Sequence, residues 1–275
     1  MQGSSRGSLA TARNRLNELG AAADLGQLSG DLFAVGQLLD GQTQLRRTLA
    51  DASVPAEVRS TLIGRVLGDK VGAHALTVLS EVVALRWSSP LDLVDAVNSL
   101  AAQASFLEAQ AAGSLDEVED QLFRFARTVE REPSLRAALA SPQLPADRKG
   151  QLVDELLEGK ADPIAVRIVH AAAVTPHRRR PIERVLDGYT ELSAEIRERV
   201  VARVTLASTP REGQLEQLAA ALGRAYGREM GLQVEIDPSL LGGVVVRVND
   251  EVLDGSVARR LERVKRELGG GAVAS

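Results

Sequence analysis

The chain has 275 residues, of which 44% are hydrophobic and 25% are charged, and its formal net charge at pH 7 is −4. A chain of this length suggests two or three domains, and the apolar fraction excludes a disordered protein. The scarcity of aromatic residues and the negative charge argue against nucleic-acid binding, and the lack of cysteine excludes disulfides, thiol catalysis and Cys-ligated zinc.

Residues 9–110 have the spacing of short helices with one buried face. The apolar stripe of one such helix comprises Leu28, Leu32, Val35 and Leu39. Breaks between helices are expected at Gly41, Pro55, Gly68, Gly72 and Pro90. Ser53 is the predicted N-cap of the helix that has Pro55 in its first turn.

The second part of the chain repeats this punctuation. Further helices are predicted over residues 115–130, 134–140, 145–159, 164–174 and 182–196. Short helices joined by short loops favour compact bundles, with five to six helices in each.

After residue 197 the pattern changes to β-branched, alternating segments. Strands are predicted over residues 200–206, 233–237, 244–248 and 251–254. Helices are predicted over residues 210–229 and 257–268. The sequence therefore predicts a mostly α protein: two tandem short-helix bundles followed by a small β-α-β-β-α module.

Residues 25–85 and 115–175 align with each other without a gap. Leu32-Phe33 returns as Leu122-Phe123, 90 positions later, and Leu45-Arg46 returns as Leu135-Arg136. A repeat of this length is a whole domain, because common repeat units are only about 20–50 residues long. We therefore expect two copies of one helical domain.

The sequence offers no convincing catalytic, cofactor-binding or metal-binding site. Its three histidines have no HExxH or other zinc-ligand spacing. Gly242-Gly243 leads into a strand and lacks the motif of a phosphate loop, so a tight turn is the simpler explanation. Ser256 has no visible base. The basic residues 177–180 fit either a solvated loop or a surface for an anionic partner.

No run of residues approaches the roughly 18–20 apolar residues of a membrane-spanning helix. The N-terminal segment Met1–Leu19 carries arginines but no apolar core of a signal peptide. We expect a protein that neither spans a membrane nor is secreted by that route, and that reaches a membrane only through a partner.

The C-terminal module contains a specific motif. Asp237–Val248 reads DPSLLGGVVVRV, and Asp254-Gly255-Ser256 and a basic helical segment follow it. This order resembles the signature of the delta subunit of F-type ATP synthase, a relative of the mitochondrial oligomycin-sensitivity-conferring protein. The resemblance covers residues 104–268. Residues 1–103 resemble a duplicate of the family's helical domain, as in long actinobacterial forms.

The resemblance implies three domains: an extra helical domain over residues 1–103, the usual helical domain over 104–196 and a stalk-binding module over 197–275. It also implies a non-catalytic stator subunit of a proton-translocating ATP synthase, without a cofactor. Its partners would be the N-terminal helices of the alpha subunits and the b-type peripheral stalk, at the cytoplasmic face of the cell membrane.

Two sets of contact residues follow from the resemblance. The groove for an alpha-subunit helix would lie between the first and fifth helices of the second copy, at Phe106, Leu107, Ile168, Val169 and Ala172. Each of these residues is equally well explained as core. The stalk-facing residues would be Val244, Val246, Val257, Leu261 and Val264.

Two other functions remain open. A tandem helical adaptor outside ATP synthase would explain the repeat but not the motif that begins at Asp237. An enzyme that uses Asp254 and Ser256 or the Gly242-Gly243 turn would lack a base and a phosphate loop.

Overall fold

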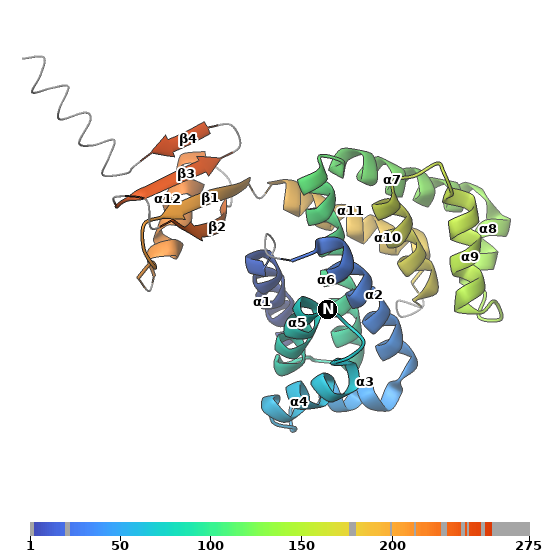
Figure 1. Ribbon diagram of the computed structural model, residues 1–275. Helices are drawn as coiled ribbons and strands as arrows, with labels where there is room; N and C mark the ends of the chain where they lie inside the picture. The colour runs from blue at the N-terminus through green and yellow to red at the C-terminus, as the bar shows by residue number, and fades with distance from the viewer. Residues whose placement is uncertain are drawn as a thin grey trace, which may run out of the picture. The chain divides into compact units, whose positions relative to one another are not determined.

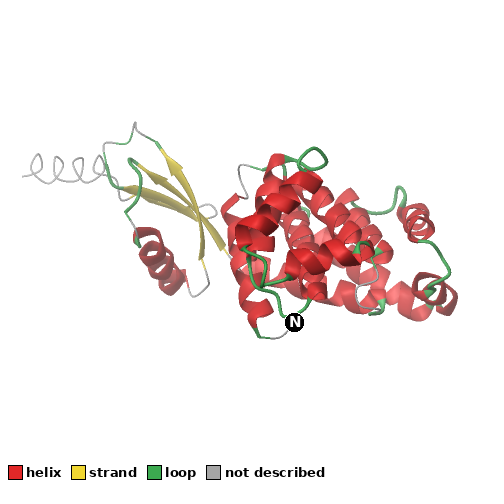
Figure 2. Cartoon of the chain, turned by 90° about the horizontal axis from the view of Figure 1, so that it is seen from below, coloured by secondary structure: helices red, strands yellow, loops and turns green. Residues whose placement is uncertain are grey.

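The computed structural model describes residues 3–19, 23–175, 180–198, 200–211, 213–226, 230–237, 240, 242–248 and 251–254. The chain forms two compact units, Met1–Ile196 and Arg197–Ser275. The regular elements described in the first unit are all helices, and the second unit is a small α/β module (Figures 1 and 2). The predicted mostly α fold is confirmed.

The helices of the first unit repeat at an offset of 90 residues. The first six are α1 Ser4–Leu19, α2 Leu25–Gly41, α3 Thr43–Ala50, α4 Ala56–Leu67, α5 Ala73–Ala84 and α6 Pro90–Ala112. The next five are α7 Leu115–Arg131, α8 Pro133–Ala140, α9 Ala146–Leu157, α10 Pro163–Val174 and α11 Ile182–Glu198. Adding 90 to both ends of α2, α3, α4 and α5 gives the bounds of α7, α8, α9 and α10.

Helix α6 belongs to both copies. Shifting α1 forward by 90 residues places it at 94–109, and shifting α11 back by 90 residues places it at 92–108; both ranges lie inside α6. The predicted domain boundary between residues 103 and 104 also falls inside this helix. One cluster of buried apolar residues runs from Ala12 to Ile196. The copies therefore share a helix and a core.

The ends of α6 are set by local sequence. The Ser89 hydroxyl accepts a hydrogen bond from Leu91 N, and Pro90 occupies the first turn, where its missing N–H costs nothing. At the other end Gly113 has φ 74°, a left-handed conformation that glycine adopts without strain. Ser114 N then donates to Ala109 O at 2.8 Å.

The predicted cap of α4 is wrong. Pro55 is the N-cap residue and makes no side-chain cap hydrogen bond. Ser53 instead uses both its backbone N–H and its hydroxyl to contact Asp51 Oδ1, at 2.9 and 2.7 Å. Ser53 therefore lies two residues before the N-cap position, and its contact with the carboxylate lowers the pKa of Asp51.

The second unit contains a mixed sheet and a helix. Its described elements are β1 Val200–Leu206, α12 Gln214–Tyr226, β2 Met230–Ile236, β3 Val244–Val248 and β4 Glu251–Asp254. The strand order is β2-β1-β3-β4; β1 pairs with β2 in parallel, and the other pairs are antiparallel. Helix α12 lies against one face of the sheet (Figure 2). The predicted helix over residues 257–268 lies outside the described residues.

The core of this module follows the alternation of its strands. Val204 pairs with Val234 on β2 and with Val246 on β3. Val204, Val246 and Leu222 of α12 are buried together. Side chains of residues paired directly across neighbouring strands point to the same face, so this row of valines places one apolar face of the sheet against the helix.

Candidate functional site

The predicted groove residues lie in the core of the helical unit. Phe106 and Ile168 are fully buried, Val169 is 1% exposed and Ala172 is 4% exposed. Leu107 is partly buried and packs against the same core. Helices α6 and α10 do contact each other, so the structure brings the predicted residues together. The side chains of these residues take part in the buried packing of α6 and α10.

Helix α2 of the first copy covers the face formed by α6 and α10. It packs against both helices and runs antiparallel to α6 (Figure 1). The Ser29 and Ser105 hydroxyls are 2.6 Å apart, and both residues are fully buried. A Cβ added at Gly36 would collide with the side-chain amide of Asn98. Small residues on α2 therefore permit a close approach of the two backbones.

A charged pair closes one end of this contact. Arg167 of α10 forms an ion pair with Glu108 of α6, and its Nε donates to the Ser105 hydroxyl at 3.4 Å. A Cβ at Gly26 of α2 would lie 2.9 Å from the Glu108 carboxylate. The side chains at this end of α2, α6 and α10 thus form one polar cluster.

The equivalent face of the first copy is open and polar. Three fully buried residues of α6 are Ala101, Ala104 and Ser105. Their counterparts on α1 are Thr11, Asn14 and Arg15, all exposed. Two buried residues of α10, Ile164 and Ala171, correspond to His74 and Glu81 of α5, both exposed. The sequence of each face matches its environment: apolar and small where it is covered, polar where it is solvated.

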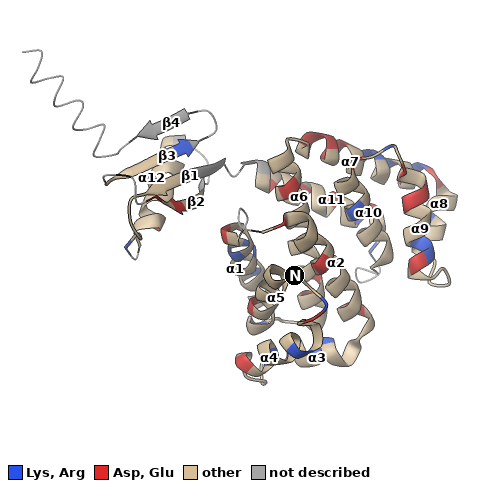
Figure 3. Ribbon diagram, in the orientation of Figure 1, with Lys and Arg blue, Asp and Glu red and all other residues tan. Residues whose placement is uncertain are grey.

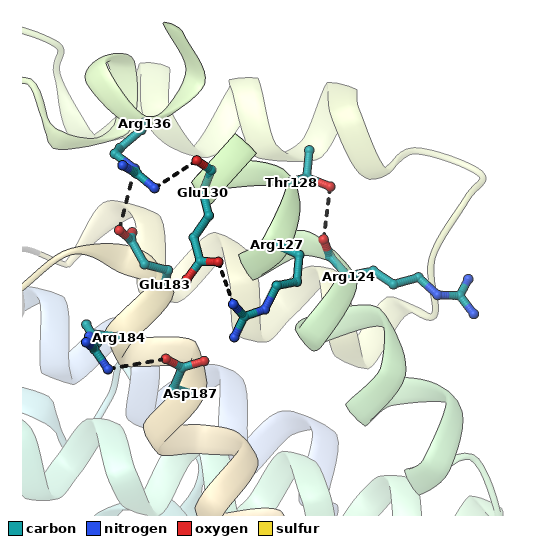
Figure 4. Close-up of polar contacts among 8 residues, drawn as sticks. All are labelled: Arg124, Arg127, Thr128, Glu130, Arg136, Glu183, Arg184 and Asp187. Atoms are coloured by element: carbon teal, nitrogen blue, oxygen red, sulfur yellow. Dashed lines mark hydrogen bonds and ion pairs between the residues drawn. The ribbon is translucent and has the colours of Figure 1, made fainter. Parts of the chain in front are cut away.

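A repeated arginine joins successive helices in each copy. Arg136 of α8 donates to Glu130 O at the end of α7, at 2.9 Å, and lies 3.6 Å from the Glu183 carboxylate of α11 (Figure 4). Its counterpart Arg46 donates to Leu39 O at 3.1 Å. A guanidinium at a helix C-terminus satisfies free carbonyls and interacts favourably with the helix dipole. The arginines that the repeat preserves are therefore capping residues.

The two described stalk-facing candidates belong to the core of the α/β module. Val246 is 4% exposed and Val244 packs against the same apolar cluster. Val257, Leu261 and Val264 lie outside the described residues. The Gly242-Gly243 turn has φ values of 128° and 90°, which glycine alone adopts without strain, so the tight-turn interpretation explains both glycines.

The ionisable side chains of His170 and Tyr189 lie in different environments of the helical unit. His170 Nδ1 lies 2.9 Å from Asp154 Oδ1 on the half-exposed surface between α9 and α10. Burial raises the pKa of the Tyr189 hydroxyl.

The described residues include no cluster of three or more His, Asp or Glu that could hold a metal ion. Charges of both signs are spread along α7, α8 and α9 (Figure 3).

None of the helices within the described ranges is both long and apolar enough to cross a bilayer.

Comparison with known proteins identifies the family. The family model of the ATP synthase delta (OSCP) subunit matches residues 98–268, which is more than half of the chain. The chain belongs to this family. The family consists of subunits of the ATP synthase complex, and the predicted resemblance is confirmed.

Relatives of this delta-family chain also contain the region of its N-terminal copy. The ATP synthase subunit delta of Streptomyces griseus is 44% identical over 272 residues, which cover 98% of this chain and 100% of the relative. The subunits of a Parafrankia species and of Thermobifida fusca are each 42% identical and also align over 98% of this chain. The region matched by the family model begins inside α6, whereas these relatives share the whole duplicated form.

Proposed function

We propose that this delta-family chain is a stator subunit of a proton-translocating F-type ATP synthase. It links the alpha subunits of the catalytic head to the b-type peripheral stalk, so that the head resists the torque of the rotating central stalk. The match of residues 98–268 to the delta family is the observation that carries this proposal. In this role the chain has no catalytic residues or cofactor of its own, and it sits peripherally at the cytoplasmic face of the cell membrane.

The helical unit is the proposed binding partner of the N-terminal helices of alpha subunits. A stator contact must not slip under load, and an amphipathic helix packed against a rigid helical surface meets this requirement. The continuous core from Ala12 to Ile196 makes the two copies a stiff support for such a contact. The α/β module is the proposed partner of the b-type stalk.

Binding of the alpha-subunit N-terminal peptide to the full-length chain tests this function. We expect saturable binding in titration calorimetry, and no binding of a peptide with the same composition in scrambled order. A tandem adaptor that works outside ATP synthase would bind neither peptide. The absence of binding by the intact chain would therefore contradict the stator function.

A further inference from the structure

The face between α6 and α10 already holds a helix of the same chain. Three small residues of α2, Gly26, Ser29 and Gly36, meet Glu108, Ser105 and Asn98 of α6 in turn. These contacts extend over three turns of α2, and α2 also packs on α10. This close packing leaves no room for a second helix along α6 on that side.

The adjoining face of α2 is part of the continuous apolar core of the helical unit. Leu28 and Val35 are each 2% exposed, and Leu32 and Leu39 are fully buried. Helix α2 thus connects this core to the α6–α10 face. It could leave α6 only if the core opened, and each of these leucines would then become exposed to water.

The repeat shows that this face is covered by a helix in the second copy and is solvated in the first. The corresponding face of the first copy, on α1 and α5, is solvated and carries the Arg15–Glu81 ion pair at 4.0 Å. Its sequence has polar residues where α6 and α10 have alanine, serine and isoleucine. The two faces have therefore diverged in the way expected if only one of them is covered permanently.

We propose that α2 is the permanent occupant of the α6–α10 face, and that the first copy thereby closes this face to partner helices. An alpha-subunit helix then binds the helical unit outside this face. The identity of that helix rests on the proposed function, whereas the occupancy by α2 rests on the contacts within this chain. The N-terminal copy thus provides, through α2, an intramolecular ligand for the second copy.

A reversible cross-link between α2 and α6 tests the proposal. The chain has no cysteine, so the double variant Ser29→Cys/Ser105→Cys carries a single possible disulfide at a site where the two hydroxyl oxygens are 2.6 Å apart. The matched control is Ser4→Cys/Ser88→Cys, whose hydroxyls are 3.0 Å apart and which ties α1 to the α5–α6 loop without holding α2.

The measurement is the affinity for the alpha-subunit N-terminal peptide in the oxidised and reduced states. If α2 is a permanent occupant, oxidation of the Ser29→Cys/Ser105→Cys variant changes Kd by no more than about twofold, as in the control. A loss of affinity of about tenfold or more on oxidation, restored by reduction and absent from the control, would show that α2 must leave and would overturn the proposal.

A second measurement separates this proposal from the proposed function. In the single variant Ser105→Cys the introduced thiol lies under α2, so we expect a thiol reagent to modify it only at the rate of global unfolding, with or without peptide. Faster labelling of the folded chain would refute permanent occupancy. If no form of the chain binds the peptide, the stator function fails, and the labelling rate still decides the role of α2.

Discussion

Arg59 is a buried cation that pairs with backbone carbonyls. The residue is 3% exposed, and its side chain donates to Val54 O at 3.1 Å, Ala84 O at 3.2 Å and Leu85 O at 2.9 Å. Two of these carbonyls lie at the end of α5, where the helix dipole favours positive charge. Five donors in a planar fork allow one guanidinium to serve several carbonyls, which a lysine ammonium does less well.

The first prediction concerns this guanidinium. Replacing Arg59 by lysine keeps the charge but leaves buried carbonyls at the end of α5 without a donor. We expect Arg59→Lys to lower the free energy of unfolding by about 1–3 kcal/mol in urea titrations. The control Arg47→Lys, at an exposed position of α3, should change it little. Equal effects of the two substitutions would show that the fork geometry of Arg59 is unimportant.

The arginine that caps the end of α5 is present only in the first copy. The residue equivalent to Arg59 is Lys149, whose pKa is lowered by partial burial. The sequence did not reveal the role of Arg59, because a lone arginine in an amphipathic helix is usually solvated. The sequence did contain one indication, because the repeat has Arg59 in the first copy and Lys149 in the second. Arginine and lysine differ most where several acceptors converge.

At the scale of elements, the helix bounds were largely predictable. Four helices of each copy recur at an offset of 90 residues, and glycine, proline and capping residues mark their ends. Local chemistry decides such boundaries, so a sequence can report them. The exception is Ser53: the helix begins at Ala56, two residues later than a cap at Ser53 would place it, and Ser53 bonds to Asp51 instead.

The packing of the predicted groove was not predictable in the same way. Phe106 and Ile168 are apolar and periodic, and this pattern is the same for a residue that receives a partner and for one that fills a core. The cover supplied by α2 depends on contacts between residues such as Ser29 and Ser105, 76 positions apart. A signal for the shared helix did exist: α1 and α11 both map onto α6 at the offset that relates the two copies.

The second prediction compares two glycines of α2. A Cβ at Gly36 meets the buried Asn98 side chain, whereas a Cβ at Gly30 meets nothing within 4 Å. Alanine is a better helix former than glycine by about 1 kcal/mol, so Gly30→Ala should raise the melting temperature of the helical unit. Gly36→Ala should lower it, because the steric clash exceeds that gain. A stabilising effect of both substitutions would contradict the close packing of α2 on α6.

At the scale of the molecule, the helical unit behaves as one body because its copies share α6 and one core. A linker between two complete bundles would let each copy unfold alone, whereas a shared helix removes part of both copies when either one opens. This continuity suits the proposed stator role, in which the chain holds a stationary head against torque. It also makes the N-terminal copy part of the structural support of the second copy.

The most direct test uses a matched pair of core residues. Leu32 of α2 and Leu122 of α7 are 90 positions apart and fully buried, so truncation of either to alanine should cost about 2–5 kcal/mol. Native-state hydrogen exchange of Leu32→Ala, followed on the amides of α2 and α10, measures whether the copies are coupled. We expect both helices to lose protection equally, as they also do in Leu122→Ala. Unchanged protection of α10 in Leu32→Ala would show that the two copies fold independently.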